Sequence, residues 1–183
     1  MSTTTDRSCF VLFDSAMGRC GIAWGGQGIC GVQLPEASAQ QTFQRMCQRF
    51  PAAQEMLPPP LVQAVIDGVV AMLRGQPHDF SALVLDMRGV PAFHQRVYAL
   101  ALAIAPGQTL TYGELAARLG EPGAARAVGQ ALGRNPFAPV VPCHRVLAAG
   151  DKPGGFSAAG GIRTKLRLLI IEGAMHDMPG LFD

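Results

Sequence analysis

Apolar residues follow two different periods along the chain: both occur in the first half, and the helical period dominates the second. In residues 9–34, three short β-prone runs, CFVLF, CGIAW and ICGVQL, are separated by glycine-containing turns, which predicts a small antiparallel meander. Helical spacing follows in residues 36–49 and 60–74, and the alternating ALVLDM at 82–87 predicts a further strand. Residues 1–88 are therefore predicted to form an α/β domain.

The second half of the chain is predicted to be mainly helical. Its composition changes at MRGVP, so we place a domain boundary there and assign 89–183 to a second domain. The segments with helical patterns are 93–104, 111–119, 124–133 and 162–172, and either Thr109 or Thr111 fits the N-cap of the second. The second and third helices are joined by a tight turn, an outline shared by a helix-turn-helix and by ordinary paired helices.

Small residues dominate the predicted helix at 124–133, where Ala, Gly and Val surround a single Arg126. A helix that merely faces water normally carries more Glu, Lys and Gln. The backbone of this one can approach a nucleic-acid groove closely while one cation projects. DNA binding is therefore one interpretation of this segment, and a generic helix pair is the other.

Composition restricts the location of the protein. A length of 183 residues is enough for one large or two small domains. No apolar run reaches the roughly 20 residues of a membrane span, and the polar start lacks an export signal. The five cysteines have no repeating spacing, which argues against a disulfide framework. We expect a cytoplasmic protein without a membrane segment.

Charge is distributed unevenly between the two predicted domains. Residues 1–88 carry six Arg and seven acidic residues, a net charge of −1, whereas 89–183 carry nine Lys or Arg and six acidic residues, a net charge of +3. The basic bias of the second domain is compatible with a polyanionic partner. It is equally compatible with an ordinary solvated surface.

The hexapeptide VPCHRV at 141–146 carries the candidate chemistry. Cys143 is followed by His144 and Arg145, and a base and a guanidinium beside a thiol favour the reactive thiolate. The alternative is an inert buried cysteine that packs as a small hydrophobe. The Gly-rich stretch DKPGGFSAAGG at 151–161 predicts either a binding loop or a flexible surface turn.

Five segments of the second half carry a joint pattern: TYGELAARLG, AARAVGQALGRNP, VPCHRV, GGFSAAGG and KLRLLIIEGA. In this order and at these spacings, they resemble the O6-alkylguanine-DNA alkyltransferase family. The resemblance covers about residues 90–175, and residues 9–89 fit the family's variable N-terminal domain in size and pattern. It implies a ribonuclease H-like N-terminal α/β domain, followed by a mainly helical domain with a helix-turn-helix. The implied activity is DNA repair: an alkyl group moves irreversibly from O6 of guanine, less readily from O4 of thymine, onto a protein cysteine in a single turnover.

The resemblance also assigns roles to residues. Cys143 is implied as the acceptor, His144 as the base that takes its proton through a water, and Glu172 as the acid that orients this histidine. Tyr112 is implied to donate to the guanine ring and to promote base flipping. Asn135 is implied to tie the exit of the recognition helix to an extended cysteine segment. By residue type alone, His144 and Tyr112 also fit ordinary core positions, and Glu172 fits a surface charge.

Further residues are implied to contact DNA or the flipped base. Arg126 is expected to enter the duplex in place of the extruded base. The small residues that permit a close minor-groove approach are Ala124, Ala125, Ala127 and Gly129. The candidate phosphate contacts are His94, Arg96 and Arg134. The expected substrate pocket is formed by Ser157, Phe156, Val146 and Pro142.

Partners and alternatives follow from the same motifs. We expect double-stranded DNA containing O6-alkylguanine as the partner, a monomer without an obligate protein partner, and no cofactor. No structural metal is expected, because Cys9, Cys20 and Cys30 lack close pairs and a nearby histidine. One alternative is a non-catalytic lesion-binding protein, which the presence of Cys143 disfavours. Another is a cysteine hydrolase, which needs an oxyanion site that the sequence does not reveal.

Overall fold

The N-terminal part of the chain forms a four-stranded sheet in the order β3-β2-β1-β4. In the computed structural model, which describes residues 7–176, β1 to β3 form an antiparallel meander and the short β4 runs parallel to β1. The strands are β1 (Cys9–Ser15), β2 (Gly18–Gly25), β3 (Gly28–Gln33) and β4 (Gln54–Glu55). The predicted meander is confirmed.

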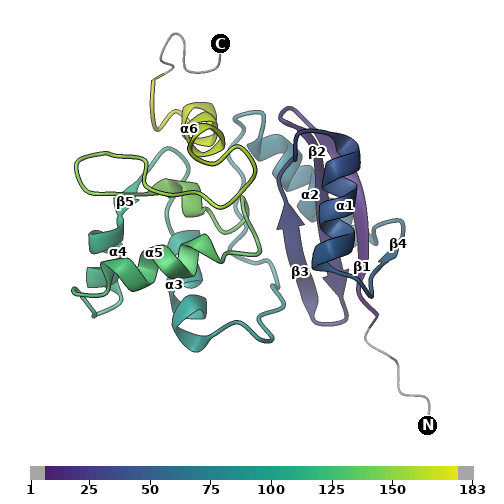
Figure 1. Ribbon diagram of the computed structural model, residues 1–183, viewed down its shortest axis with the longest axis horizontal. Coiled ribbons are helices and arrows are strands. Elements are labelled where there is room, and N and C mark those ends of the chain that lie inside the picture. Colours follow the sequence, from purple (N-terminus) through teal and green to yellow (C-terminus); the bar gives the residue numbers. More distant parts are fainter. Residues whose placement is uncertain (1–6, 177–183) are drawn as a thin grey trace.

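The alternation of side chains along the strands buries both faces of the sheet. On one face, Phe10 and Ala23 pack on Met46 of α1 (Ala39–Arg49). On the other, Phe13 and Ile22 join the main core, to which α2 (Pro60–Met72) contributes its apolar side. Figure 1 shows α1 in front of the sheet and α2 behind it. Period-two alternation with two apolar sets is the pattern expected of a sheet covered on both sides.

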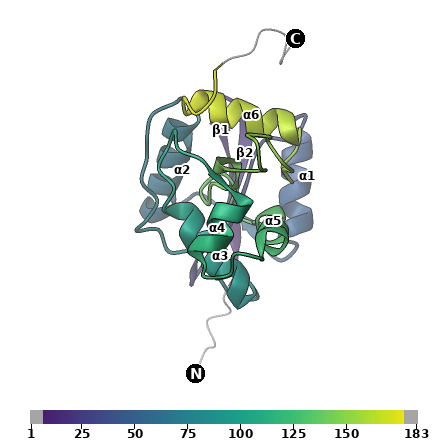
Figure 2. The ribbon, with the colours of Figure 1, turned by 90° about the vertical axis from the view of Figure 1, so that its left-hand side faces the viewer.

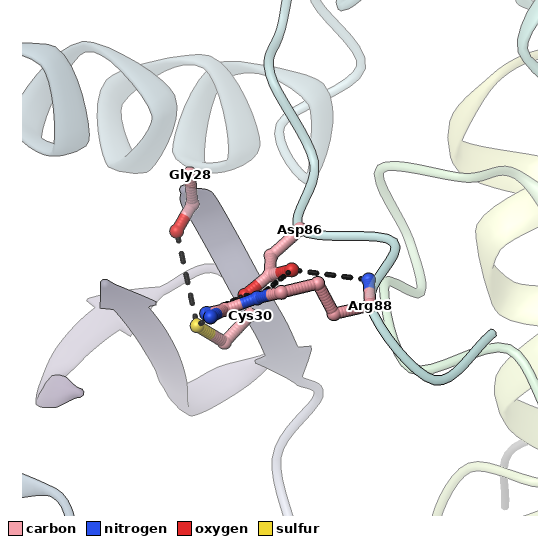
Figure 3. A network of polar contacts seen from close by, with 4 residues as sticks. All are labelled: Gly28, Cys30, Asp86 and Arg88. Carbon is pink, nitrogen blue, oxygen red and sulfur yellow. Dashed lines mark hydrogen bonds and ion pairs between the residues drawn. The ribbon is translucent and has the colours of Figure 1, made fainter. Parts of the chain in front are cut away.

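Residues 82–87 do not form the predicted strand. Leu85 makes a single parallel bridge with Ile29, flanked by hydrogen bonds from the Ile29 amide to Val84 and from the Asp86 amide to Ile29. The Asp86 carboxylate then accepts from both the backbone and the guanidinium of Arg88, and it faces Cys30 of β3 (Figure 3). This side-chain-to-backbone bond turns the chain and ends the pairing after one bridge.

The second part of the chain is mainly helical, as predicted. Its elements are α3 (Ala92–Leu102), α4 (Tyr112–Arg118), α5 (Ala125–Gly133) and α6 (Ile162–Ile171), with the parallel two-residue strands β5 (Leu110–Thr111) and β6 (Val146–Leu147). Both α3 and α4 pack against α5, and Figure 2 shows α6 crossing above them. Tyr98 of α3 is fully buried and donates to the Ala131 carbonyl of α5 at 2.8 Å.

The segment around Cys143 is not extended, contrary to our expectation. Cys143–Arg145 form a 3₁₀ turn, closed by a 2.9 Å hydrogen bond from the Arg145 amide to the Pro142 carbonyl. Three residues complete one turn of such a helix, so consecutive side chains point in directions about 120° apart. The thiol, the imidazole and the guanidinium therefore leave this turn toward different surroundings.

Residues 7–176 contain neither a membrane-spanning helix nor a cluster of metal ligands. Within them, no helix combines the length and the apolarity needed to cross a membrane. The same part of the chain brings together no group of three or more His, Cys, Asp or Glu side chains that could hold a metal ion. The expectation of no structural metal remains a prediction.

The N-terminus of α4 provides a stability test. Thr111 accepts a hydrogen bond from the Glu114 amide, and the Glu114 carboxylate accepts one from the Thr111 amide. We expect Thr111→Ala to cost about 1 kcal/mol of unfolding free energy because it removes this capping box. Thr109→Ala, the same change two residues earlier, should cost less than about 0.5 kcal/mol. Urea unfolding measures both, and equal losses would contradict the assignment of the cap.

Candidate active site

Cys143 lies on a pocket of about 530 Å³ between α4, α5 and the Gly-rich loop. Seven of the predicted site residues line it: Tyr112, Ala125, Arg126, Gly129, Cys143, Phe156 and Ser157. The other lining residues are Gln130, Leu132, Gly133 and Gly155. The pocket thus joins the small-residue helix and the Gly-rich loop, which the sequence had suggested separately.

Other predicted residues lie outside this pocket. Pro142 and Val146 are buried and do not line it. Arg96 pairs with Glu121 at 2.8 Å and donates to the Leu119 carbonyl, so it links α3 to the turn after α4. Ala124 and Ala127 lie half-buried on or beside α5. His94 packs beside Tyr98 and is half-buried, whereas Arg134 is exposed at the end of α5.

The environment of the Cys143 thiol differs from the one expected. Burial raises the pKa of Cys143, while a hydrogen bond with the Asn135 side chain and the positive charge of Lys165 act in the opposite direction. The guanidinium of Arg145 points elsewhere, toward Glu172 and the Ile104 carbonyl. The thiolate is therefore not favoured by Arg145, and its nearby cation is Lys165.

His144 and Arg145 share one buried carboxylate. Glu172, the C-cap residue of α6, accepts two hydrogen bonds from Arg145, at 2.9 and 2.7 Å. Nε2 of His144 lies 3.0 Å from the same carboxylate. Burial alone raises the pKa of Glu172, but the contacts with His144 and Arg145 outweigh it and lower this pKa to about 2. Glu172 is thus a charged group inside the protein.

The imidazole of His144 is fully buried. Burial lowers its pKa, and the attraction of Glu172 offsets this only in part. Within residues 7–176, neither ring nitrogen of His144 has a hydrogen bond of acceptable geometry. Nε2 is nevertheless close to the Glu172 carboxylate. A neutral imidazole of this kind can accept a proton, and the carboxylate beside it stabilises the imidazolium that results.

Asn135 connects the end of α5 to the segment that leads to Cys143. Its Nδ2 donates to the Val141 carbonyl at 2.7 Å, and its Oδ1 accepts from the Phe137 amide at 2.8 Å. The Cys143 amide also donates to the Val141 carbonyl, at 2.9 Å. One side chain therefore closes the loop between α5 and the cysteine turn.

Lys165 is a site residue that the sequence interpretation missed. Its side chain is fully buried, and Nζ donates to the Val146 carbonyl at 2.6 Å and to the Gly155 carbonyl at 3.2 Å, and it lies 3.5 Å from the Tyr112 hydroxyl. Burial lowers its pKa to about 8. Lys165 lies three and four residues before Leu168 and Leu169, which puts a lysine on the apolar face of the helix, and this charge among apolar positions was the available signal.

Comparisons with known proteins agree with this geometry. The profile described as 6-O-methylguanine DNA methyltransferase, DNA binding domain, matches residues 92–174. The chain is 38% identical over 160 residues to the methylated-DNA–protein-cysteine methyltransferase of Mycobacterium tuberculosis, covering 87% of this chain and 88% of that one. It is 35% identical over 153 residues to the enzyme of the same name from Methanothermobacter thermautotrophicus, covering 84% and 78%. The chain belongs to the methylated-DNA–protein-cysteine methyltransferase family.

A solved structure supports the same assignment for the fold. The crystal structure of Mycobacterium tuberculosis OGT in complex with DNA matches with a TM-score of 0.72 and 35% identity, over 95% of this chain and 99% of that one. Every residue that lines the Cys143 pocket lies within the matched methyltransferase region. The predicted family and the α/β class are therefore confirmed.

Gly154 controls the position of Tyr112 in this methyltransferase. A Cβ atom on Gly154 would lie 2.7 Å from the Tyr112 hydroxyl, whereas one on Gly150 would meet nothing within 4 Å. The two residues have similar positive φ angles, 70° and 73°. The strain of a non-glycine residue there, about 1 to 2 kcal/mol, is thus common to both.

We expect Gly154→Ala to lose more stability than Gly150→Ala, by about 1 to 3 kcal/mol, because it alone forces Tyr112 to move. Urea unfolding of the two variants gives the difference. Equal stabilities would mean that Tyr112 is not held against the loop at this point.

Proposed function

We propose that this protein repairs DNA by taking the alkyl group of O6-alkylguanine onto Cys143, irreversibly and once per molecule. Methyl transfer from methylated DNA to a protein cysteine is the activity of its family, and this chain shares it. The observation that carries the assignment to Cys143 is its place in the pocket that Arg126 also lines, directly before His144, which contacts Glu172.

The reaction is a displacement at the alkyl carbon. The sulfur of Cys143 forms a bond to this carbon as the bond from carbon to O6 breaks, and the electron pair of that bond leaves with the guanine. The product on the protein is a thioether, which water does not cleave at neutral pH. No step regenerates the thiol, so the stoichiometry is limited to one.

His144 activates the thiol in this proposal. The pKa of Cys143 is raised by burial, so the thiol has to lose its proton when the substrate is present. The neutral, buried imidazole is suited to accept this proton through a bridging water on Nδ1, while Nε2 faces the ionised Glu172. Arg145 holds the carboxylate in place, and the relay ends in an imidazolium–carboxylate pair.

Lys165 and Tyr112 are the groups that we propose to stabilise negative charge at the site. The ammonium of Lys165 lowers the pKa of Cys143 and lies 3.5 Å from the Tyr112 hydroxyl. We assign to Tyr112 the donation of a hydrogen bond to the guanine ring as it gains charge. Backbone groups of the loop around Ser157 lie on the same pocket and are suited to face O6.

The proposed approach to DNA uses α4 and α5 as a helix-turn-helix in the minor groove. Arg126 is exposed on α5 and also lines the pocket, so it is placed to fill the space of the flipped base. The small residues of α5 permit a close approach, and His94 and Arg134 are proposed phosphate contacts. Such binding depends on phosphates, and we expect it to be salt-sensitive and weak in sequence preference.

We propose a monomer that acts on double-stranded DNA, accepts O4-alkylthymine less readily and needs no cofactor. A domain boundary at residues 88 and 89 is supported by the start of the family profile at residue 92. The non-catalytic lesion-binder is not favoured, because the curated relatives are named as methyltransferases.

Cys143→Ala tests the proposal. We expect repair of an oligonucleotide that contains O6-methylguanine to be abolished, because the acceptor sulfur is gone, with binding to the same DNA retained. A restriction-protection assay measures repair, and a gel shift measures binding. Cys20→Ala, a change of another buried cysteine, is the matched control. Repair by Cys143→Ala at the normal rate would refute the assignment.

Arg126→Ala separates base flipping from alkyl transfer. We expect a loss of roughly tenfold or more in the rate on duplex DNA, because the extruded base is no longer replaced in the stack. Reaction with free O6-benzylguanine, which needs no flipping, should change little. Arg74→Ala removes an exposed arginine from the other part of the protein and controls for net charge. Equal losses on the two substrates would argue against this role of Arg126.

A further inference from the structure

Arg49, at the end of α1, lies across the contact between the N-terminal sheet and the turn that follows α5. One guanidinium nitrogen donates to the Val32 carbonyl at 2.8 Å and to Oε1 of Gln33 at 2.9 Å. The other donates to the Pro136 carbonyl at 2.9 Å. The Pro136 carbonyl also accepts from the Val32 amide, at 3.0 Å. A single planar group therefore binds β3 and the turn together.

Partial burial of Arg49 accompanies this contact. It lowers the pKa of Arg49 to about 10, with a further lowering by the positive charge of Arg45, so the guanidinium remains charged at neutral pH. Its three acceptors are uncharged oxygens. A charged donor taken out of water is costly unless such bonds are kept. The turn is thereby held in one position relative to the sheet.

Gly31 indicates that the contact requires a close fit. A Cβ atom on Gly31 would lie 2.8 Å from the Arg49 guanidinium and 3.2 Å from the Pro136 oxygen. It would also lie 2.6 Å from the ring of Phe50. The absence of a side chain at Gly31 of β3 thus leaves the space through which the Arg49 guanidinium reaches the turn.

The turn that Arg49 holds is the one that carries Asn135. Pro136 is its direct neighbour, and Asn135 bonds both Phe137 and Val141 within the same turn. The Val141 carbonyl, to which Asn135 donates, also accepts from the Cys143 amide at 2.9 Å, and the side chain of Asn135 acts to lower the pKa of the Cys143 thiol. A displacement of Pro136 is therefore passed to Asn135 and from there to the thiol.

We propose that Arg49 is a positioning residue for alkyl transfer: by binding the Pro136 carbonyl, it lets the N-terminal part of the protein hold Asn135 against Cys143. Arg49 does not line the Cys143 pocket. The inference rests on the proposed role of Cys143 and gives the N-terminal region a defined part in the reaction.

The test compares rates of methyl transfer at saturating lesion DNA with affinities for the same DNA. Arg49→Met keeps the aliphatic stem and removes the donors, and we expect the maximal rate to fall about 10- to 100-fold while the affinity changes less than about twofold. Arg49→Lys should restore part of the rate, because an ammonium can still donate to Pro136. Arg45→Met removes an exposed arginine from the same helix and should leave the rate unchanged.

A double-mutant cycle with Asn135→Ala separates positioning from general stability. If Arg49 acts through Asn135, Arg49→Met will slow the Asn135→Ala protein by less than about twofold. Multiplicative losses in the double variant, or equal rates for Arg49→Met and Arg45→Met, would overturn the proposal. Should Arg49→Met fail to fold, Gly31→Ala makes the same comparison, because it displaces the guanidinium without removing it.

The rate of reaction with iodoacetamide separates a failure of the proposed role of Arg49 from a failure of the proposed function. Alkylation of Cys143 by this reagent requires no DNA, and we expect it to be slower in Arg49→Met than in Arg45→Met. If the unmodified protein transfers no methyl group from DNA, the proposed function fails, and the iodoacetamide rates still decide whether Arg49 acts on Cys143.

Discussion

The buried carboxylate of Glu172 is the interaction on which the site depends. A charged group at the end of a helix and inside the protein requires partners, since an unpaired buried charge is strongly destabilising. Arg145 supplies two hydrogen bonds, and His144 lies 3.0 Å away. Both residues belong to the turn that begins at Cys143, so this single carboxylate joins α6 to the reactive segment. The same pairing keeps Glu172 ionised and places its carboxylate beside the imidazole of His144.

Two further contacts reach Cys143 from other directions. Lys165, also on α6, brings the positive charge, and Asn135 brings a hydrogen bond from the end of α5. These groups favour the thiolate, whereas burial favours the thiol. The net effect raises the pKa of Cys143, so the thiol stays protonated in the resting protein, and in the proposed reaction it loses its proton to His144. This arrangement suits a residue that reacts only once.

Periodicity and motif were sufficient for much of this structure. The meander of β1 to β3 and the helices of the second part follow from local patterns, and Cys143 was selected by its neighbours in sequence. Contacts between distant segments were not predictable in this way. Residues 82–87 alternate like a strand, but the bond of Asp86 to Arg88 ends their pairing. Arg145 looked like an activator of Cys143 because it is close in sequence, whereas the 3₁₀ turn directs it to Glu172. Arg49 gave no local signal, since Pro136 is 87 residues away.

Intact-protein mass spectrometry with peptide mapping tests the central claim most directly, after the protein is mixed with an excess of an oligonucleotide that contains O6-methylguanine. The account predicts a gain of one methyl group, about 14 Da, on the peptide that contains Cys143, with a stoichiometry that never exceeds one. A methyl group on another residue, or no change in mass while the lesion is bound tightly, would contradict it.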